Sequence, residues 1–312
     1  MNMHTGSSAT NETCQSPWPR RAALAAALLT VPILLIGGTV TTLRVGMAVP
    51  DWPTTFEQNM FTYPLSEMLR DMGVFWEHSH RLWGALVGFA VLCTCVLTLV
   101  YERSVRLRWL SVVALLAVSA QGVLGGLRVL ENSQHLAFLH GTFAQGLFTL
   151  FCAQALLHST SWRLALPRAS AQVAFLNKWG LVTSVAIYVQ IALGAWTRHN
   201  GGMHALFAHM GLALLVTGLV VVLGAGCGKV ADEGGADAPR WRALKRRLHL
   251  LLGVQVLLGI LAAVWVYLVT GPHNPVSVGE AVFATLHVAV GALLLWSTVS
   301  CWLWTRRTLR AH

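Results

Sequence analysis

The sequence predicts an all-α integral membrane protein whose eight transmembrane helices form two parallel-repeat four-helix bundles. Three observations lead to this prediction. The chain is 55% hydrophobic and only 11% charged, it contains eight long apolar runs, and some of these runs repeat one another. A soluble domain has roughly 25% charged residues, so most of the surface of this protein should face something other than water.

The apolar runs follow one another with short connections and leave no long segment for a soluble domain. Each is about 20 residues long, which is enough to cross the hydrocarbon core of a bilayer. The first run resembles a signal peptide, but it is too long for one and lacks a clear cleavage site before Pro50, so we expect a retained helix. The runs cover residues 22–43, 76–100, 109–127, 136–157, 179–197, 205–224, 250–269 and 281–304.

The net charge of +10 orients the chain and gives no reason to expect a nucleic-acid partner. If the N-terminus is inside, the outer side carries only Arg44, Arg70, Arg81, Arg128 and Arg198. All other Lys and Arg residues, Arg310 included, fall on the inner side. The positive-inside rule therefore predicts a multi-pass protein of the cell (inner) membrane with both termini in the cytoplasm. None of the six cysteines, Cys14 among them, falls in an outer segment, so no extracytoplasmic disulfide is expected.

Two connections differ from the others in composition. The first outer loop, residues 45–75, holds Pro50, Asp51, Trp52 and Pro53 and is expected to form an ordered cap rather than a strand pair. The inner loop 226–247 is rich in Gly, Ala and Asp and ends in basic residues. We predict a flexible connector there, with its basic end near anionic headgroups.

The internal repeat has the length of a helix pair. Gln121-x-x-Leu124-Gly125 recurs 69 residues later as Gln190-x-x-Leu193-Gly194 and a third time around Gln255 and Gly259. The segment that begins at His80 also resembles the one that begins at His287. We therefore expect an N-terminal half, residues 1–165, and a C-terminal half, residues 166–312, related by a pseudo-twofold axis along the membrane normal.

Four histidines are the strongest candidates for chemistry. Each should lie in the first turns of a helix that enters from the outer side, and ionisable residues at that depth are costly and usually functional. Two facing pairs would form two bis-imidazole sites, and imidazole suits iron, copper and zinc. A di-iron site needs more carboxylates than the chain offers, so haem iron between two histidines fits best. The four are His80, His140, His209 and His287.

Other polar residues on the outer side have two interpretations each. Glu77 shares a helical face with His80 and either pairs with Arg81 or exchanges a proton with a bound substrate. Arg44, Arg128 and Arg198 follow Gly-rich helix ends and either pair with haem propionates or reach the headgroups. For the remaining outer histidines we favour supporting or interfacial roles; they are His78, His135, His199 and His204.

These residues resemble the haem A synthase family over about residues 20–310. The resemblance is carried by Glu77-His78-Ser79-His80-Arg81, by Gly37-Gly38 with Arg44 and Asp51-Trp52, and by the histidines on alternate helices, which are His140, His209 and His287. Some bacterial members have cysteine pairs in outer loops, whereas this chain resembles the branch without them.

The resemblance implies a reaction and a role for each half. The family oxidises a ring methyl of haem O to a formyl group and so supplies haem A to cytochrome c oxidase. The N-terminal half would bind the substrate haem between His80 and His140, with Glu77 as the catalytic residue. The C-terminal half would bind a haem b cofactor, with its iron between His209 and His287. The partners implied are haem O, its synthase and an electron donor, and a homo-oligomer is compatible with the sequence.

Several questions stay open at the level of sequence. An iron with two histidine ligands has no free position for oxygen, so either a ligand leaves during turnover or the haem loses electrons and water supplies the oxygen. A dihaem b-type electron-transfer protein is the main alternative, although such proteins commonly place their haems near opposite membrane faces. A haem-delivery protein without chemistry is another.

Overall fold

The computed structural model describes residues 16–168, 170–271 and 274–309, so Cys14 and Arg310 lie outside the described residues. Within these ranges the chain is helical, and the only β-pairing is an isolated bridge between Thr55 and Gln58. The elements are α1 (Trp18–Thr42), α2 (Leu65–Met68), α3 (Met72–Tyr101), α4 (Val105–Leu130), α5 (Gln134–Leu157), α6 (Thr160–Arg163), α7 (Ala171–Asn200), α8 (Met203–Asp232), α9 (Ala238–Val264), its π-helical continuation η1 (Trp265–Thr270), and α10 (Val278–Leu309).

Eight of the helices are long and apolar enough to cross a membrane, which confirms the predicted multi-pass membrane fold. The helices extend beyond the predicted apolar runs because polar residues begin them. Asp71 accepts hydrogen bonds from the backbone N–H groups of Gly73 and Val74 at the start of α3. Ser104 and Ser133 cap α4 and α5 in the same way. These caps satisfy N–H groups that the first turn of a helix leaves without partners.

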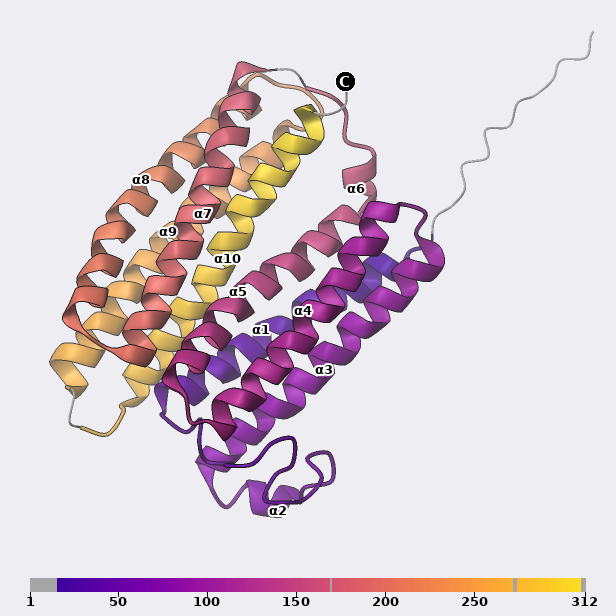
Figure 1. Cartoon of the computed structure of the whole chain (residues 1–312). Coiled ribbons are helices and arrows are strands. Elements are labelled where there is room, and N and C mark those ends of the chain that lie inside the picture. The colour runs from indigo at the N-terminus through magenta and orange to yellow at the C-terminus, as the bar shows by residue number, and fades with distance from the viewer. Residues whose placement is uncertain (1–15, 169, 272–273, 310–312) are drawn as a thin grey trace, which may run out of the picture.

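The long helices lie in two groups, as Figure 1 shows. In the first group α1 and α4 each contact α3 and α5, and in the second α7 and α9 each contact α8 and α10. The groups meet where α1 and α5 contact α10 and where α5 contacts α7. Leu34, Phe148 and Ala292 form a small apolar cluster at this junction. The pseudo-twofold relation of the two halves stays a prediction.

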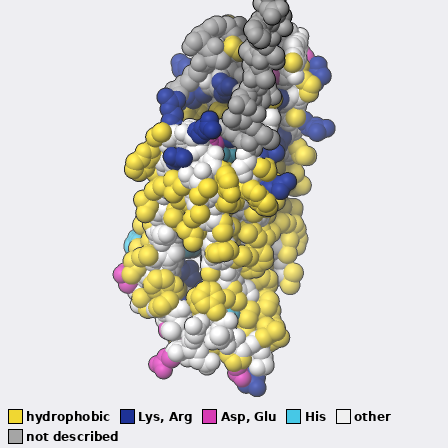
Figure 2. Space-filling view, turned by 90° about the vertical axis from the view of Figure 1, so that its right-hand side faces the viewer, with side chains coloured by type: hydrophobic (Ala, Val, Ile, Leu, Met, Phe, Trp, Pro, Cys, Tyr) yellow, Lys and Arg dark blue, Asp and Glu magenta, His cyan; other side chains and the backbone are white. Residues whose placement is uncertain are grey.

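The two ends of the helical body differ in their side chains. We call the end that carries residues 43–71, at the bottom of Figure 1, the loop end, and the opposite end the basic end. The face in Figure 2 has a hydrophobic middle zone, with Lys and Arg gathered toward the basic end and acidic side chains toward the loop end. α3, α5, α8 and α10, the helices that carry the four candidate histidines, all begin at the loop end.

The predicted flexible connector at residues 226–247 is wrong. α8 continues to Asp232 and α9 begins at Ala238, which leaves only residues 233–237 between them. The glycines of this region allow close helix packing, since a Cβ on Gly226 would lie 2.7 Å from a methyl carbon of Leu176. Arg168 then fastens the short turn, because its guanidinium donates to the Gly234 carbonyl and to Asp237 Oδ1.

Candidate functional site

The four candidate histidines come together as two pairs of nearly identical geometry. The ring centroids of His80 and His140 lie 6.1 Å apart with an angle of 71° between the planes. Those of His209 and His287 lie 6.3 Å apart with an angle of 73°. Each histidine is the seventh to tenth residue of its helix. At a rise of 1.5 Å per residue they therefore lie about 9–14 Å along the helix from its start.

The spacing of both pairs suits one metal ion held between two imidazoles. A ring nitrogen binds such a metal at about 2.0 Å and lies about 1.1 Å from the ring centroid, so two coaxial ligands have centroids about 6.2 Å apart. The described residues contain no group of three or more His, Cys, Asp or Glu side chains that would hold a bare metal ion. A site of only two ligands fits haem, because the porphyrin supplies the other four nitrogens.

A glycine lies against the ring of each histidine. In all four cases a Cβ on the glycine would lie 2.8–2.9 Å from the histidine Cε1 atom, which is closer than real Cβ contacts allow. These glycines therefore make room for the imidazoles. The glycine–histidine contacts are Gly37–His80, Gly125–His140, Gly194–His209 and Gly259–His287.

The glutamine of the repeat orients the histidines of the second pair. His209 Nδ1 lies 3.0 Å from the Gln190 carbonyl oxygen, and His287 Nδ1 lies 3.2 Å from that of Gln255. Because a carbonyl only accepts, each Nδ1 carries the proton and each Nε2 is an acceptor. The side-chain amide nitrogens of the same two glutamines lie 3.3 Å from His209 Nε2 and 3.2 Å from His287 Nε2. Metal-binding histidines commonly donate their second nitrogen to a carbonyl in this way.

The first pair has weaker support. The side-chain amide of Gln121 donates to the His140 backbone carbonyl at 3.0 Å. The backbone carbonyl of Gln121 lies near the His140 ring, but His140 Nδ1 has no partner that meets hydrogen-bond geometry. On α1 the place of the glutamine, four residues before Gly37, is taken by Ile33. Among the described residues, Nδ1 of His80 and of His140 have no hydrogen-bond partner. The two pairs therefore share their ring spacing but differ in what fixes the rings.

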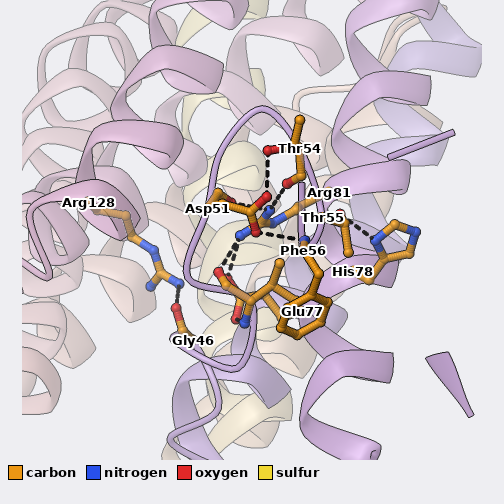
Figure 3. A network of polar contacts seen from close by, with 10 residues as sticks. Gly46, Asp51, Thr54, Thr55, Phe56, Glu77, His78, Arg81 and Arg128 are labelled. Carbon is orange, nitrogen blue, oxygen red and sulfur yellow. Dashed lines mark hydrogen bonds and ion pairs between the residues drawn. The ribbon is translucent and has the colours of Figure 1, made fainter. Parts of the chain in front are cut away.

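Glu77 lies beside the first pair and is 2% exposed. Its Oε1 accepts from Arg81 Nη2 at 3.0 Å, and its Oε2 accepts from the Val49 backbone N–H at 2.9 Å. The ion pair that the sequence offered as one interpretation of Glu77 is thus present. Figure 3 shows Glu77 and Arg81 under the arch of the loop. The C-terminal half has no such pair at the matching positions, which are Ala284 and Val288.

Arg81 fastens the loop over this site. It donates to the carbonyl oxygens of Val49, Asp51 and Thr54 at 2.6–2.8 Å, in addition to Glu77. The ordered loop that the sequence predicted between α1 and α3 is therefore present. The loop contains no cysteine and is held by the Arg81 guanidinium through backbone carbonyls. Two residues of the loop itself, Val49 and Thr55, are fully buried.

Asp51 orders the loop from within. Its side chain accepts from the backbone N–H groups of Phe56 and Glu57, both at 2.9 Å, and from the Thr54 hydroxyl. Partial burial raises the pKa of Asp51, but these hydrogen bonds outweigh it and hold the pKa below its ordinary value. The turn is thus built around a charged carboxylate.

The three candidate arginines have different surroundings. Arg128 Nη2 donates to the Gly46 carbonyl at 2.8 Å, and its charge interacts with that of Glu77. Arg198 donates from α7 to the Gly38 carbonyl and the Thr42 hydroxyl of α1, and so joins the two groups of helices. Arg44 is exposed, beside a shallow groove lined by Met72 and Asn274 among others.

The remaining histidines at the loop end lie outside both pairs. His78 is buried, and its Nδ1 lies 3.0 Å from the Thr55 hydroxyl of the loop. His199 lies near Gly141, one residue beyond His140. His135 packs against Trp196 at 5.9 Å, and His204 is exposed.

Trp52 has a role that the sequence did not reveal. Its indole packs so closely on Gly126 of α4 that a Cβ there would overlap the ring. Gly126 follows Gly125, which contacts His140. The loop therefore packs on α4 next to the residue that supports His140. The adjacent glycines were visible in the sequence, but their partner is 74 residues away, so no local pattern indicated it.

Comparison with known protein families identifies a match over most of the chain. The profile of the COX15-CtaA family, described as cytochrome oxidase assembly protein, matches residues 20–305. The match includes both histidine pairs, the loop and all of the eight long helices except the first two residues of α1 and the last four of α10. No curated protein matches the chain.

Proposed function

The chain belongs to the COX15-CtaA family of cytochrome oxidase assembly proteins, and on this basis we propose that it is a haem A synthase that oxidises a ring methyl of haem O to a formyl group. The observation that carries the proposal is the presence of two similar histidine pairs with unequal surroundings. Among the described residues, Glu77 lies three positions before His80 on α3, whereas Glu280, the buried carboxylate on α10, lies seven positions before His287 and has no arginine four positions after it. A protein that merely held two haems would not need this asymmetry.

The second pair is assigned to a resident haem b. Hydrogen bonds from Nδ1 of His209 and His287 to backbone carbonyls support this assignment, because they fix the rings and increase the basicity of the coordinating nitrogens. A haem bound there would supply one-electron transfer. The protein contributes the ring orientation and an apolar surrounding, in which Leu212 and Leu294 belong to the core of the second group.

The first pair is assigned to the substrate haem O. Its rings have no hydrogen-bond partner at Nδ1 among the described residues, which favours a ligand set that exchanges. Converting a methyl to a formyl group is a four-electron oxidation. With water as the oxygen source, R–CH3 + H2O gives R–CHO + 4 H+ + 4 e−, so four protons leave the site and an external electron acceptor takes four electrons; with O2 as the source, O2 is the oxidant. Glu77 is the nearest buried carboxylate to accept a proton, and Arg81 and the Val49 N–H hold its two oxygens in place.

We further propose that the protein lies in the cell (inner) membrane, with both termini in the cytoplasm and the loop end on the extracytoplasmic side. Lys and Arg residues concentrate at the basic end, as the positive-inside rule requires of a cytoplasmic face. Both histidine pairs would then lie toward the extracytoplasmic side, within one leaflet.

Pigment analysis tests the proposal. Cells that express this chain together with a source of haem O should accumulate haem A, identified by mass after extraction. Glu77→Gln keeps the shape of the side chain and an acceptor for the Val49 N–H but removes the charge, so it should retain bound haem and lose formyl product by about 100-fold or more, within the usual contribution of a general acid or base. Bound haem without any haem A in the wild type would contradict the proposal and favour a dihaem electron-transfer protein.

A further inference from the structure

We propose that residues 49–56, here called the cap, close the first histidine site and control haem exchange there, with Trp52 as the residue that seals it. The inference rests on the proposed function, because it concerns the haem bound between His80 and His140. It assigns positioning roles to Trp52 and Arg81.

The cap is anchored to α3 by three residues from two successive turns. Glu77 accepts from the Val49 N–H, Arg81 donates to three carbonyls between Val49 and Thr54, and His78 bonds the Thr55 hydroxyl. His80, the first ligand, lies between Arg81 and His78 in the sequence. Any shift of the cap is therefore transmitted to the turn of α3 that carries the ligand.

Trp52 connects the cap to the other ligand. Its indole lies on Gly126, and the neighbouring Gly125 contacts the imidazole of His140. Arg128, two residues after Gly126 on α4, donates to the carbonyl of Gly46, three residues before the cap. The cap thus spans from the helix of one ligand to the helix that supports the other.

The connections at the second histidine site are shorter than the loop that carries the cap. The α7–α8 connection consists of Gly201 and Gly202, and only seven residues separate the end of η1 at Thr270 from the start of α10, where Trp265 packs on Gly279. The resident haem is instead fixed through Nδ1 of its ligands. A site that must admit substrate and release product needs a part that can open, and the cap is fastened mainly by polar contacts at the aqueous end of α3. When the cap opens, each of these contacts can be replaced by a hydrogen bond to water.

A haem-transfer experiment tests this role. Purified protein loaded with haem is mixed with excess apomyoglobin, and transfer is followed by absorbance. His80→Ala identifies the phase that belongs to the first site, because that phase disappears in this variant. Trp52→Ala should accelerate this phase by about tenfold or more, since lost contacts act mainly on dissociation rates, and should leave the phase of the second site unchanged.

Gly126→Ala provides a test that does not remove the indole. The new methyl group displaces Trp52, so this variant should also accelerate the first phase. In the double variant Trp52→Ala/Gly126→Ala the clash is gone, and its rate should match that of Trp52→Ala alone rather than the product of both effects. Phe61→Ala is the matched control, because Phe61 is an exposed aromatic residue of the same loop, and its rate should equal that of the wild type.

Two outcomes overturn the inference. One is a first-site phase in Trp52→Ala and in Trp52→Phe that equals the wild type. The other is additive acceleration in the double variant, which would mean that Gly126 acts independently of the cap. Neither depends on product formation. Wild-type protein that exchanges haem as expected but makes no haem A would refute the proposed function and leave the cap in place, whereas haem A production with an unchanged Trp52→Ala phase would refute only the cap.

Discussion

The two histidine pairs have the same ring spacing but different surroundings. Centroid distances of 6.1 and 6.3 Å come from a repeated device, in which a glycine on one helix receives the imidazole of the next. The repeat therefore accounts for what the sites share, two imidazoles at the same spacing. It does not account for the different roles that we propose for them.

That difference comes from residues outside the shared pattern. The second pair has backbone carbonyl partners at both Nδ1 atoms, whereas neither Nδ1 of the first pair has a partner among the described residues. The first pair also has Ile33 where the repeat has a glutamine side chain, the buried Glu77, and a loop held above it by Arg81. Tight support suits a haem that stays, and loose support with a carboxylate suits a haem that is changed. Each prediction below separates the two sites by one substitution.

Loss of a ligand should have the largest effect, and an unequal one. His209→Ala should abolish retention of the haem assigned to the second site. Removing a residue that only supports a metal ligand lowers affinity about 10- to 100-fold, and removing the ligand itself should lower it more. His80→Ala should keep that haem through purification. Haem content per protein and the reduced absorption spectrum measure both. Equal haem loss in the two variants would remove the distinction between resident and substrate sites.

A methyl group on the supporting glycines should have the next largest effect. Gly259→Ala and Gly125→Ala place a Cβ 2.8–2.9 Å from an imidazole carbon, and such overpacking costs about 1–3 kcal/mol. We expect a lower thermal midpoint and a shifted haem spectrum, from the second site in Gly259→Ala and from the first in Gly125→Ala.

The matched controls for these glycines lie on the same helices. A Cβ on Gly253 of α9 or on Gly122 of α4 meets nothing within 4 Å. Alanine there should stabilise the protein by about 0.5–1 kcal/mol, because glycine is the poorer helix former. Destabilisation by the control substitutions as large as that of the test substitutions would show that the imidazole contact is not the cause.

The sequence predicted local features of both sites better than the contacts between distant segments. The four histidines and the eight helices were predictable because hydropathy and helical depth are properties of single segments. The Gln-x-x-Leu-Gly repeat was visible, but its meaning, a carbonyl for Nδ1 and a space for the ring, required the neighbouring helix. The contacts of Trp52 with Gly126 and of Arg81 with the loop carbonyls join segments 27–74 residues apart, and no periodicity encodes them.

The connector between α8 and α9 shows the opposite error. Its glycines and aspartates are typical of flexible loops, yet Gly226 and Gly228 lie inside α8, where they contact Leu176 and Lys245. Composition alone does not distinguish a glycine that bends the chain from one that admits a neighbouring helix. The same ambiguity concealed the role of the glycines beneath the histidines.

Removal of the repeat glutamine should have a moderate effect. Gln190→Leu loses the side-chain amide, which donates to the His209 carbonyl at 2.8 Å and lies 3.3 Å from His209 Nε2, but keeps the backbone carbonyl at position 190 that accepts from Nδ1. A hydrogen bond of this kind contributes about 0.5–1.5 kcal/mol, so haem release from the second site should accelerate by up to about tenfold. The same haem transfer to apomyoglobin measures it. If the release rate of the second site stays at the wild-type value, the amide does not contribute to haem retention.

The smallest effect is expected for Arg44→Ala, and it bears on what holds the haem at its edges. Arg128 and Arg198 each donate to a backbone carbonyl near a histidine pair, whereas Arg44 is exposed at the loop end beside the groove lined by Met72 and Asn274. Substitution of such a surface residue usually changes stability by less than about 0.5 kcal/mol, so both haem-transfer phases and the thermal midpoint should stay at wild-type values. Faster release from the first site alone would mean that the substrate haem extends past α1 into this groove and that Arg44 binds one of its propionates. Faster release from both sites would instead place Arg44 in the packing of the two groups of helices.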